Sequence, residues 1–309
     1  MNTDWHILGA GAMGGLFAHR LAGAGFRPIL LSRSGQTGSQ PLTFHASDAT
    51  LTEHFDYQAI HESETIRRLW VCTKSFDIVG ALQAVLGRLA PDAHIVLMAN
   101  GMGYQEQVAA LLTEQSLFVA TTTAGCYRSS PQSWVIAGAG ETHVGGWQAS
   151  IARPTWASTL TAQPWHCVWE QDMSQLLLKK LAINCAINPP TALWDITNGD
   201  LLSGAYAPQF HAAIAELTQV FQYLGNADLA AEITTLIPAV ARQTATNTSS
   251  MRADVQHCRP TEIEAILGFL VEQLIGLENS EAPPATPILH HWLNSVRRHE
   301  SAIRARPAK

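Results

Sequence analysis

A glycine-rich loop near the N-terminus constrains the fold of this chain more than any other feature. The segment WHILGAGAMGG starts with a short apolar run, continues into glycines, and is followed by LFAHRLAGAGF, which has the apolar spacing of a helix. A strand, a G-x-G-x-x-G loop and a helix in this order form the phosphate-binding turn of dinucleotide-binding folds. The exposed amides at the start of such a helix favour an anion. We therefore predict a dinucleotide site at Gly9, Gly11, Ala12, Met13 and Gly14.

Each glycine of the loop has its own expected role. Gly9 permits the tight turn, Gly11 lets a pyrophosphate approach the backbone, and Gly14 allows close packing of the helix against the strand.

The end of the next predicted strand favours one nicotinamide cofactor over the other. The segment FRPILLSRSG ends in Ser32-Arg33-Ser34, where an NAD-binding protein usually has an acidic residue. An arginine and two hydroxyls suit a 2′-phosphate instead. The pattern therefore favours NADPH, with Arg33 as a contact, and a surface arginine on a loop is the alternative interpretation.

Strands continue to alternate with helices through the first half of the chain. RRLWVCTKSFD predicts a buried strand followed by a helix in IVGALQAVLGRLAP, and AHIVLMANGMGYQEQV predicts a strand to Ala99, a turn and another helix. This alternation is typical of a parallel, doubly wound sheet, in which ligands bind beyond the carboxyl ends of the strands. Lys74 and Asn100 lie at such ends, so both are candidate ligand contacts, with ordinary loop residues as the alternative.

The last part of this domain is predicted to be strand-rich. LFVATTTAGCY predicts one more strand, and SWVIAGAGETHVGGW predicts a two-stranded antiparallel extension that completes the domain.

The second half is predicted to be helical. FHAAIAELTQVFQYLG, TEIEAILGFLVEQLIGLE and ILHHWLNSVRRHES have helical periodicity, and GLENSEAPPATP is a loop. The chain thus predicts a Rossmann-like, doubly wound α/β domain over 1–170, followed by an all-helical domain over 171–309.

One helix near the start of the second domain carries an unusual polar stripe. In KKLAINCAIN, an otherwise apolar run, Lys180, Asn184 and Asn188 follow one another at intervals of four residues and so share one face. Asparagine is a poor helix former, so the stripe suggests a polar cleft with donors on a rigid element. The solvent face of an amphipathic helix is the alternative. We expect the helix to stop at Pro189-Pro190, and Lys179, about 100° away from Lys180, has no expected role.

A second polar cluster lies further along the chain. TNTSSM contains Asn247, Ser249 and Ser250, and the segment from Pro260 to Glu262 predicts a helix start with Glu262 in its first turn. A favourable charge at a helix N-terminus and a surface loop are the alternative interpretations.

Composition excludes several classes of function. A length of 309 residues usually means two domains, and a net charge of −6 without a basic block argues against nucleic-acid binding. No run of about 20 apolar residues predicts a membrane span. The five cysteines include no C-x-x-C pair and the N-terminus has no basic region before its apolar run, so we expect reduced thiols and a cytoplasmic protein. None of the 13 histidines lies in H-E-x-x-H, so no bound metal is expected.

The chain resembles the ketopantoate reductases (2-dehydropantoate 2-reductases) over most of its length. The resemblance rests on GAGAMGG, NGMG, KLAINCAINPPTALWDITNG and NTSSMRADVQHCRPTEIEAILG. It implies NADPH-dependent reduction of ketopantoate to pantoate in pantothenate biosynthesis, with Lys180 as the catalytic acid and Glu262 assisting at the substrate. It further implies that Arg33 and Lys74 contact NADPH, and that substrate or cofactor is held by Asn100, Asn184, Asn188, Asn198, Asn247 and Ser250.

Three segments depart from the family pattern. Pro190 replaces the apolar residue that commonly follows Asn-Pro, Gly125-Cys126-Tyr127 stands where other residues are usual, and 149–164 shows no family signature.

In the expected reaction, Lys180 hydrogen-bonds and protonates the carbonyl oxygen while NADPH delivers hydride to the ketone carbon. Glu262 holds the substrate hydroxyl and orients the ammonium, and Ser250 and Asn247 receive the carboxylate side. The alternatives are a reductase of another 2-oxo acid and a non-catalytic NADP(H)-sensing protein, although a sensor does not need Lys180 and Glu262 together. The expected partner is a small 2-oxo acid, with no nucleic acid and no membrane, and both a monomer and a homodimer stay open.

Overall fold

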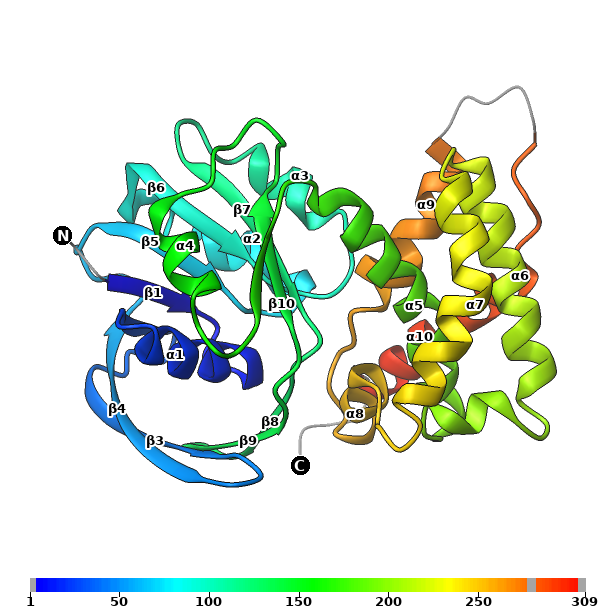
Figure 1. Cartoon of the computed structure of the whole chain (residues 1–309), viewed down its shortest axis with the longest axis horizontal. Helices are drawn as coiled ribbons and strands as arrows, with labels where there is room; N and C mark the ends of the chain where they lie inside the picture. The colour runs from blue at the N-terminus through cyan, green and yellow to red at the C-terminus, as the bar shows by residue number, and fades with distance from the viewer. Residues whose placement is uncertain (1–3, 277–281, 305–309) are drawn as a thin grey trace. The chain divides into compact units, whose positions relative to one another are not determined.

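The computed structural model describes residues 4–276 and 282–304, which form two compact units (Figure 1). The first consists of residues up to 99 together with 104–174, and the second of 100–103 together with 175 onward. The sequence suggested a boundary between 170 and 171 and assigned the loop 100–103 to the first domain. In the structure that loop belongs with the helical unit. The predicted fold class, a doubly wound α/β part followed by a helical part, is confirmed.

The described part of the first unit contains one sheet of 11 strands in the order β11-β10-β7-β6-β5-β1-β2-β4-β3-β9-β8. The neighbours from β7 to β4 in this order run parallel, as the alternation of strands and helices predicted. The strands are β1 (Asp4–Leu8), β2 (Arg27–Ser32), β3 (Gly38–His45), β4 (Thr50–Ala59), β5 (Ile66–Val71), β6 (Leu89–Leu97), β7 (Ser116–Thr122), β8 (Gly125–Ser130), β9 (Ser133–Gly138), β10 (Thr142–Gly146) and β11 (Cys167–Glu170). The helices of this unit are α1 (Ala12–Gly23), α2 (Ser75–Gln83), η1 (Leu86–Arg88), α3 (Tyr104–Ala109) and α4 (Thr155–Thr161).

The sheet curls around helix α1. Only Thr123 and Ala124 separate β7 from β8 in the chain, yet β8 lies at the opposite end of the strand order, so the two ends of the sheet must approach each other. Figure 1 shows β3, β4, β8 and β9 curving around α1. The run from Gly14 to Ala18 is accordingly buried without interruption. The strands around α1 leave only part of it accessible, such as half-buried His19.

Aromatic side chains fill the space between α1 and the central strands. Trp70 on β5 stacks on Phe17 of α1 with ring centroids 4.8 Å apart, and Trp5 on β1 meets the edge of Trp156 on α4 at 5.2 Å. Rings of this size contribute a large buried apolar area, so this core fixes α1, and with it the glycine loop, against the sheet.

Two local predictions for the sheet are wrong. SWVIAGAGETHVGGW does not form an antiparallel pair: β9 pairs with β3 and β8, whereas β10 pairs with β7 and β11. LFVATTTAGCY is not one strand, because it contains the end of β7, a two-residue connection and the start of β8. The sequence analysis did not predict the hairpin of β3 and β4. Strand β9 pairs with β3 of this hairpin and not with β10.

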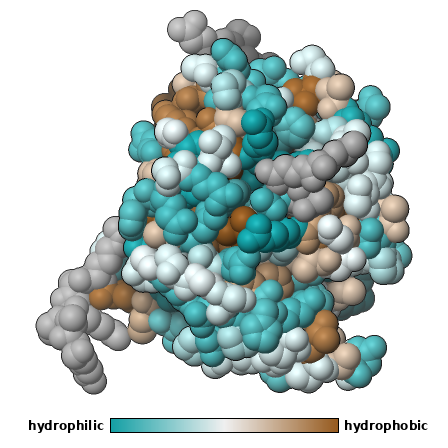
Figure 2. Space-filling view, turned by 90° about the vertical axis from the view of Figure 1, so that its left-hand side faces the viewer, coloured by the Kyte–Doolittle hydropathy of each residue, from teal (hydrophilic) through white to brown (hydrophobic). Residues whose placement is uncertain are grey.

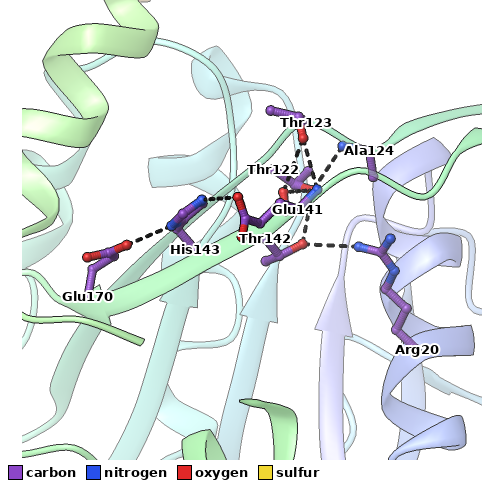
Figure 3. Close-up of polar contacts among 8 residues, drawn as sticks. All are labelled: Arg20, Thr122, Thr123, Ala124, Glu141, Thr142, His143 and Glu170. Carbon is purple, nitrogen blue, oxygen red and sulfur yellow. Dashed lines mark hydrogen bonds and ion pairs between the residues drawn. The ribbon is translucent and has the colours of Figure 1, made fainter. Parts of the chain in front are cut away.

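A buried arginine ties α1 to the strands that close around it. Arg20 is 5% exposed and donates from Nη1 to Oγ1 of Thr142, 3.0 Å away, and Thr142 donates to Oγ1 of Thr122 at 2.9 Å (Figure 3). Burial lowers the pKa of Arg20 to about 10. Next to Thr142, His143 contacts Oε1 of Glu170 at 2.8 Å, which joins β10 to β11. This polar network holds the end of α1 to the turn between β7 and β8.

The described residues of the second unit are helical. Buried Glu216 accepts hydrogen bonds from the amides of Ile288 (3.0 Å) and Leu289 (3.0 Å), so it caps the first turn of the last helix. Part of the predicted loop GLENSEAPPATP, residues 277–281, lies outside the described residues. The elements are α5 (Met173–Trp194), η2 (Gly199–Leu202), α6 (Ala207–Tyr223), α7 (Ala227–Gln243), α8 (Ser250–Gln256), the π-helix η3 (Glu264–Gly268), α9 (Phe269–Gly276) and α10 (Pro287–Arg304).

Helix α5 does not stop at Pro189-Pro190, contrary to the prediction, but continues to Trp194. Each proline removes an amide donor and costs a helix interior about 3 kcal/mol. Just after the prolines, the hydroxyl of Thr191 donates to the carbonyl oxygen of Ile187 at 2.7 Å and to that of Asn188 at 3.0 Å, which are bonds within the same helix. Both prolines are buried, so packing overrides the local preference.

Large apolar side chains are rarely exposed. Figure 2 shows a face of the molecule on which hydrophilic side chains predominate and apolar side chains form small, separate patches. In the part of the chain that the structure describes, the exposed large apolar side chains are Leu51, Phe76, Tyr127 and Ile275. Among the described residues, no helix combines the length and the apolar character needed to cross a membrane.

Candidate active site

The glycine loop has the geometry that a bound phosphate requires. Gly9 has φ +101°, and a Cβ there would lie 2.7 Å from the backbone nitrogen of Thr73. A Cβ on Gly14 would lie 2.0 Å from the carbonyl oxygen of Gly9. A Cβ on Gly11, in contrast, would meet nothing within 4 Å. The first and third glycines are therefore required by packing, and the space beside the second is open to a ligand.

Helix α1 starts with its amides uncapped by any side chain. Gly11 occupies the N-cap position without a side-chain hydrogen bond, and the first turn holds no acidic residue. The first amides of a helix have no partner within it, and the helix dipole makes this end positive. The residues present, including Ala12 and Met13 in the first turn, therefore fit the pyrophosphate of a dinucleotide.

The other residues proposed for the cofactor lie at the ends of neighbouring strands. Arg33 is exposed and directly follows β2, while Ser32 uses its hydroxyl within the loop, where it accepts from the amide of Gln36 at 3.2 Å. Lys74 is half-buried at the start of α2. Thr73 beside it faces Gly9, and its buried Oγ1 has no hydrogen-bond partner in the described part of the chain.

In the helical unit, three of the predicted site residues form one cluster. Asn100 donates from Nδ2 to Oε2 of Glu262 at 2.9 Å. Lys180, on α5, keeps part of its surface accessible, yet burial of its ammonium lowers the pKa to about 8, and the negative charge of Glu262 acts in the opposite direction. A lysine, a carboxylate and an amide from three distant parts of the sequence thus meet at one place.

The loop 100–103 reaches this cluster because its glycines pack directly on η3. Gly101 has φ +86°, and a Cβ there would lie 2.2 Å from the carbonyl oxygen of Ala265. The amide of Met102 donates to the same oxygen at 2.7 Å. Gly103 has φ +96° and lies against the ring of Phe269. A π-helical turn is rare and is frequently found at functional sites, and here it receives the loop that carries Asn100.

Glu262 does not lie in the first turn of a helix, as the sequence suggested, but just before it. The acidic residue of the first turn is Glu264, which pairs with Arg297 through Oε1 and Nε at 2.7 Å. Thr261, the residue before Glu262, is fixed by two hydrogen bonds. Its Oγ1 donates to Oε1 of Glu300 at 2.6 Å and accepts from the amide of Ile263 at 3.2 Å. The interpretation as a favourable charge at a helix N-terminus therefore applies to Glu264. Glu262 is 5% exposed and belongs to the cluster with Lys180.

The polar stripe of α5 is not a solvent face. Asn188 is 6% exposed, and Nδ2 of Asn184 is buried without a hydrogen-bond partner among the described residues. A buried donor without a partner costs about 1–3 kcal/mol, so such a group marks a place where a ligand can compensate. Lys179 points elsewhere and forms an ion pair of 2.8 Å with Glu232 on α7.

The remaining candidates gather where the end of α5 meets α8. Asn198 donates from its amide to the carbonyl oxygen of Asn247 at 3.2 Å and from Nδ2 to Oγ1 of Thr244 at 3.0 Å. Ser249 is the N-cap of α8, and its Oγ lies 2.7 Å from Oγ1 of Thr191 on α5. Ser250, the next residue, is exposed. The structure thus brings Asn198 and Asn247 together and places Ser250 beside them in the chain.

In the described ranges, no group of three or more His, Cys, Asp or Glu side chains is arranged to hold a metal ion.

The first unit is Rossmann-type and has an open glycine cradle, and the helical unit holds a half-buried lysine beside a carboxylate. Together they define the class of protein, an oxidoreductase that acts on a small carbonyl substrate. The sequence matches the family model described as ketopantoate reductase PanE/ApbA over residues 5–149, and the model for the C-terminal part of the same family over residues 172–294. The chain belongs to the ketopantoate reductase family.

Individual proteins agree with this assignment. A 2-dehydropantoate 2-reductase of Vibrio cholerae is 31% identical over 298 residues, which cover 94% of this chain and 96% of the relative. One from Yersinia pestis is 32% identical over 66% of both chains. Among solved structures, a probable 2-dehydropantoate 2-reductase of Bacillus subtilis has a TM-score of 0.75 at 24% identity over 96% of this chain and 100% of its own. A D-mandelate dehydrogenase with NADH and anilino(oxo)acetate has a TM-score of 0.84 at 17% identity over 98% and 100% of the two chains, which is a likeness of fold.

Proposed function

We propose that this protein is an NADPH-dependent 2-dehydropantoate 2-reductase, which reduces ketopantoate to pantoate in pantothenate biosynthesis. The observation that carries the proposal is the cluster of buried Glu262 with half-buried Lys180 and Asn100 in a member of the ketopantoate reductase family. The names of the relatives from Vibrio cholerae and Yersinia pestis support the choice of substrate.

Lys180 acts as the proton donor to the ketone oxygen. A pKa lowered to about 8 keeps the ammonium mainly protonated at pH 7 and makes its proton easier to release than that of an ordinary lysine. When bound, NADPH supplies the hydride that goes to the ketone carbon. The ammonium hydrogen-bonds the carbonyl oxygen, stabilises the negative charge that develops there and passes a proton to it.

Glu262 orients the ammonium and holds the hydroxyl of ketopantoate. Asn100 fixes one of its carboxylate oxygens at 2.9 Å and thereby limits the directions in which the carboxylate can turn. Substrate is also held by donors from α5 and from the region around α8, where Asn247 and Ser250 receive the carboxylate side. The other donors of this set are Asn184, Asn188 and Asn198.

The cofactor is held by the first unit. The amides from Gly9 to Gly14 receive the pyrophosphate, and Arg33 contacts the 2′-phosphate of the adenosine ribose. Lys74 follows β5, which lies on the other side of β1 from β2. The charge and the fork geometry of Arg33 support NADPH over NADH.

The test is NADPH oxidation with ketopantoate beside a panel of 2-oxo acids that lack its hydroxyl. We expect the highest kcat/KM with ketopantoate. If the enzyme clearly prefers a 2-oxo acid that lacks the hydroxyl, that acid and not ketopantoate is its substrate. Tight NADPH binding with no oxidation by any 2-oxo acid would favour the sensing protein instead.

A further inference from the structure

A tryptophan from the far end of the sheet contacts the glycine loop. Trp134, on β9, is 0% exposed and donates from Nε1 to the carbonyl oxygen of Gly11 at 3.1 Å. The two residues are 123 positions apart in the chain, and the curl of the sheet around α1 brings them together. This is a side-chain hydrogen bond to the loop where the pyrophosphate is proposed to bind.

The indole is held in place from several sides. It stacks on Phe44 of β3 with ring centroids 5.7 Å apart, and the guanidinium of Arg128 lies 5.2 Å from its centre. Gly15 leaves room for it, since a Cβ on Gly15 would lie 2.2 Å from Nε1 of Trp134. The second glycine of the Gly14-Gly15 pair is therefore explained by the tryptophan.

The bond to Gly11 acts on the amide that faces the ligand. The carbonyl of Gly11 and the N–H of Ala12 belong to one planar trans peptide and point in opposite directions. The carbonyl also accepts the amide of Gly15 at 3.0 Å, so two donors from different directions fix its orientation. The N–H of Ala12 is then fixed as well, and it points outward from the start of α1, where an anion binds.

We propose that Trp134 is a positioning residue for the pyrophosphate of the cofactor: its indole N–H holds the Gly11–Ala12 peptide in the orientation that presents the Ala12 amide to the ligand. This inference rests on the proposed dinucleotide function and adds to it a residue outside the G-x-G-x-x-G loop.

The experiment compares Trp134→Phe with the wild type by isothermal titration calorimetry, using NADPH and adenosine 2′-monophosphate, which lacks the pyrophosphate. Phenylalanine keeps one aromatic ring but removes the N–H donor and part of the buried indole, and Trp165→Phe makes the same change in size. We expect the Kd for NADPH to rise about 3- to 10-fold, the effect of one neutral hydrogen bond, while the Kd for adenosine 2′-monophosphate stays the same.

Trp165→Phe is the matched control. Trp165 also contacts α1, through Phe17 at 6.1 Å and Arg20 at 4.9 Å, but its buried Nε1 has no hydrogen-bond partner in the described part of the chain. Its replacement should leave both Kd values unchanged.

Several results would overturn the proposal. The first is an NADPH affinity that does not change in Trp134→Phe, whether or not the Tm falls. The second is a loss of affinity in Trp134→Phe that is equal for NADPH and adenosine 2′-monophosphate. The third is a loss of NADPH affinity in Trp165→Phe as large as that in Trp134→Phe. Should Trp134→Phe not fold, the assigned indole N–H resonance of Trp134 in the wild type decides: a shift on addition of NADPH but not of adenosine 2′-monophosphate supports the proposal, and no shift overturns it. If the wild type does not bind NADPH, the proposed function itself fails.

Discussion

The side-chain amide of Asn100 donates a hydrogen bond of 2.9 Å to Oε2 of Glu262, 162 residues further along the chain. This bond joins the loop that follows β6 to the segment that leads into η3. Glu262 is 5% exposed, so its carboxylate depends on donors from the protein. The orientation of the carboxylate, and through its charge the pKa of Lys180, is therefore linked to the position of this loop.

Replacement of Asn100 by alanine should lower kcat/KM for ketopantoate by about 10- to 100-fold, because a hydrogen bond to a buried charged group is lost. Steady-state kinetics measures the effect. Tyr104→Phe is the control, since it removes a bond of 2.9 Å to the carbonyl oxygen of Ala99 near the same loop without touching Glu262. Equal losses in the two variants would mean that Asn100 acts only by holding the loop.

Replacement of Lys180 by alanine should lower kcat by about 10²- to 10⁴-fold, the usual contribution of a positioned acid. The affinity for NADPH should change little, because the glycine cradle lies in the other unit. Lys179→Ala should be nearly silent, since its pair with Glu232 lies at the surface, where such pairs contribute little. Similar losses of kcat in the two variants would refute the role given to Lys180.

The pH dependence of the reaction should report the ammonium of Lys180. Under the proposed mechanism the protonated form is the active one, so kcat/KM should fall as the pH rises through the pKa of about 8. The charge of Glu262 raises this pKa, so Glu262→Gln should move the alkaline limb to lower pH. Glu264→Gln should leave the limb in place, because Glu264 is exposed and paired with Arg297. If the alkaline limb stays at the same pH in Glu262→Gln, the charge of Glu262 does not influence the pKa of the group that donates the proton.

Glu262 should also discriminate between substrates. Its replacement by glutamine should reduce kcat/KM for ketopantoate more than for a 2-oxo acid that lacks the hydroxyl, because only the former has a group for the carboxylate to hold. Parallel rates with the two substrates measure this difference. A uniform loss, accompanied by a lower Tm, would assign Glu262 a structural role.

The parts of the site that the sequence predicted depend on local patterns. The roles of Gly9 and Gly14 follow from a short motif with a strand before it and a helix after it, and the stripe of Lys180 and Asn188 follows from helical periodicity. Both patterns involve residues close together in the chain. The geometry of the glycines and the burial of Asn188 agree with what those patterns implied.

The parts that the sequence missed depend on contacts between distant segments. The contact of Trp134 with Gly11 requires the sheet to curl, and the pairing of β9 with β3 is a matter of register that short segments do not specify. The continuation of α5 through Pro189-Pro190, both of which are buried, requires packing against other segments. In each case long-range packing overrode a local preference.

Arg33 provides the sharpest test of the first unit. It is exposed directly after β2, the place from which a side chain reaches the ribose of the adenosine. A guanidinium there can form charge-assisted hydrogen bonds with a 2′-phosphate, so Arg33→Ala should weaken NADPH binding by roughly 10- to 100-fold and leave NADH nearly unaffected. Arg33→Lys should recover part of the loss, because lysine keeps the charge but lacks the fork.

Titration calorimetry with both cofactors at low and high salt measures these effects. High salt should weaken NADPH binding more than NADH binding, because the ion pair between Arg33 and the 2′-phosphate of NADPH would be exposed and therefore screened. Arg67→Ala is the control, because Arg67 is an exposed arginine that pairs with Asp92 at 2.8 Å on the first unit. A wild-type protein that binds and uses NADH as well as NADPH would show that Arg33 does not select the cofactor, whatever the helical unit does.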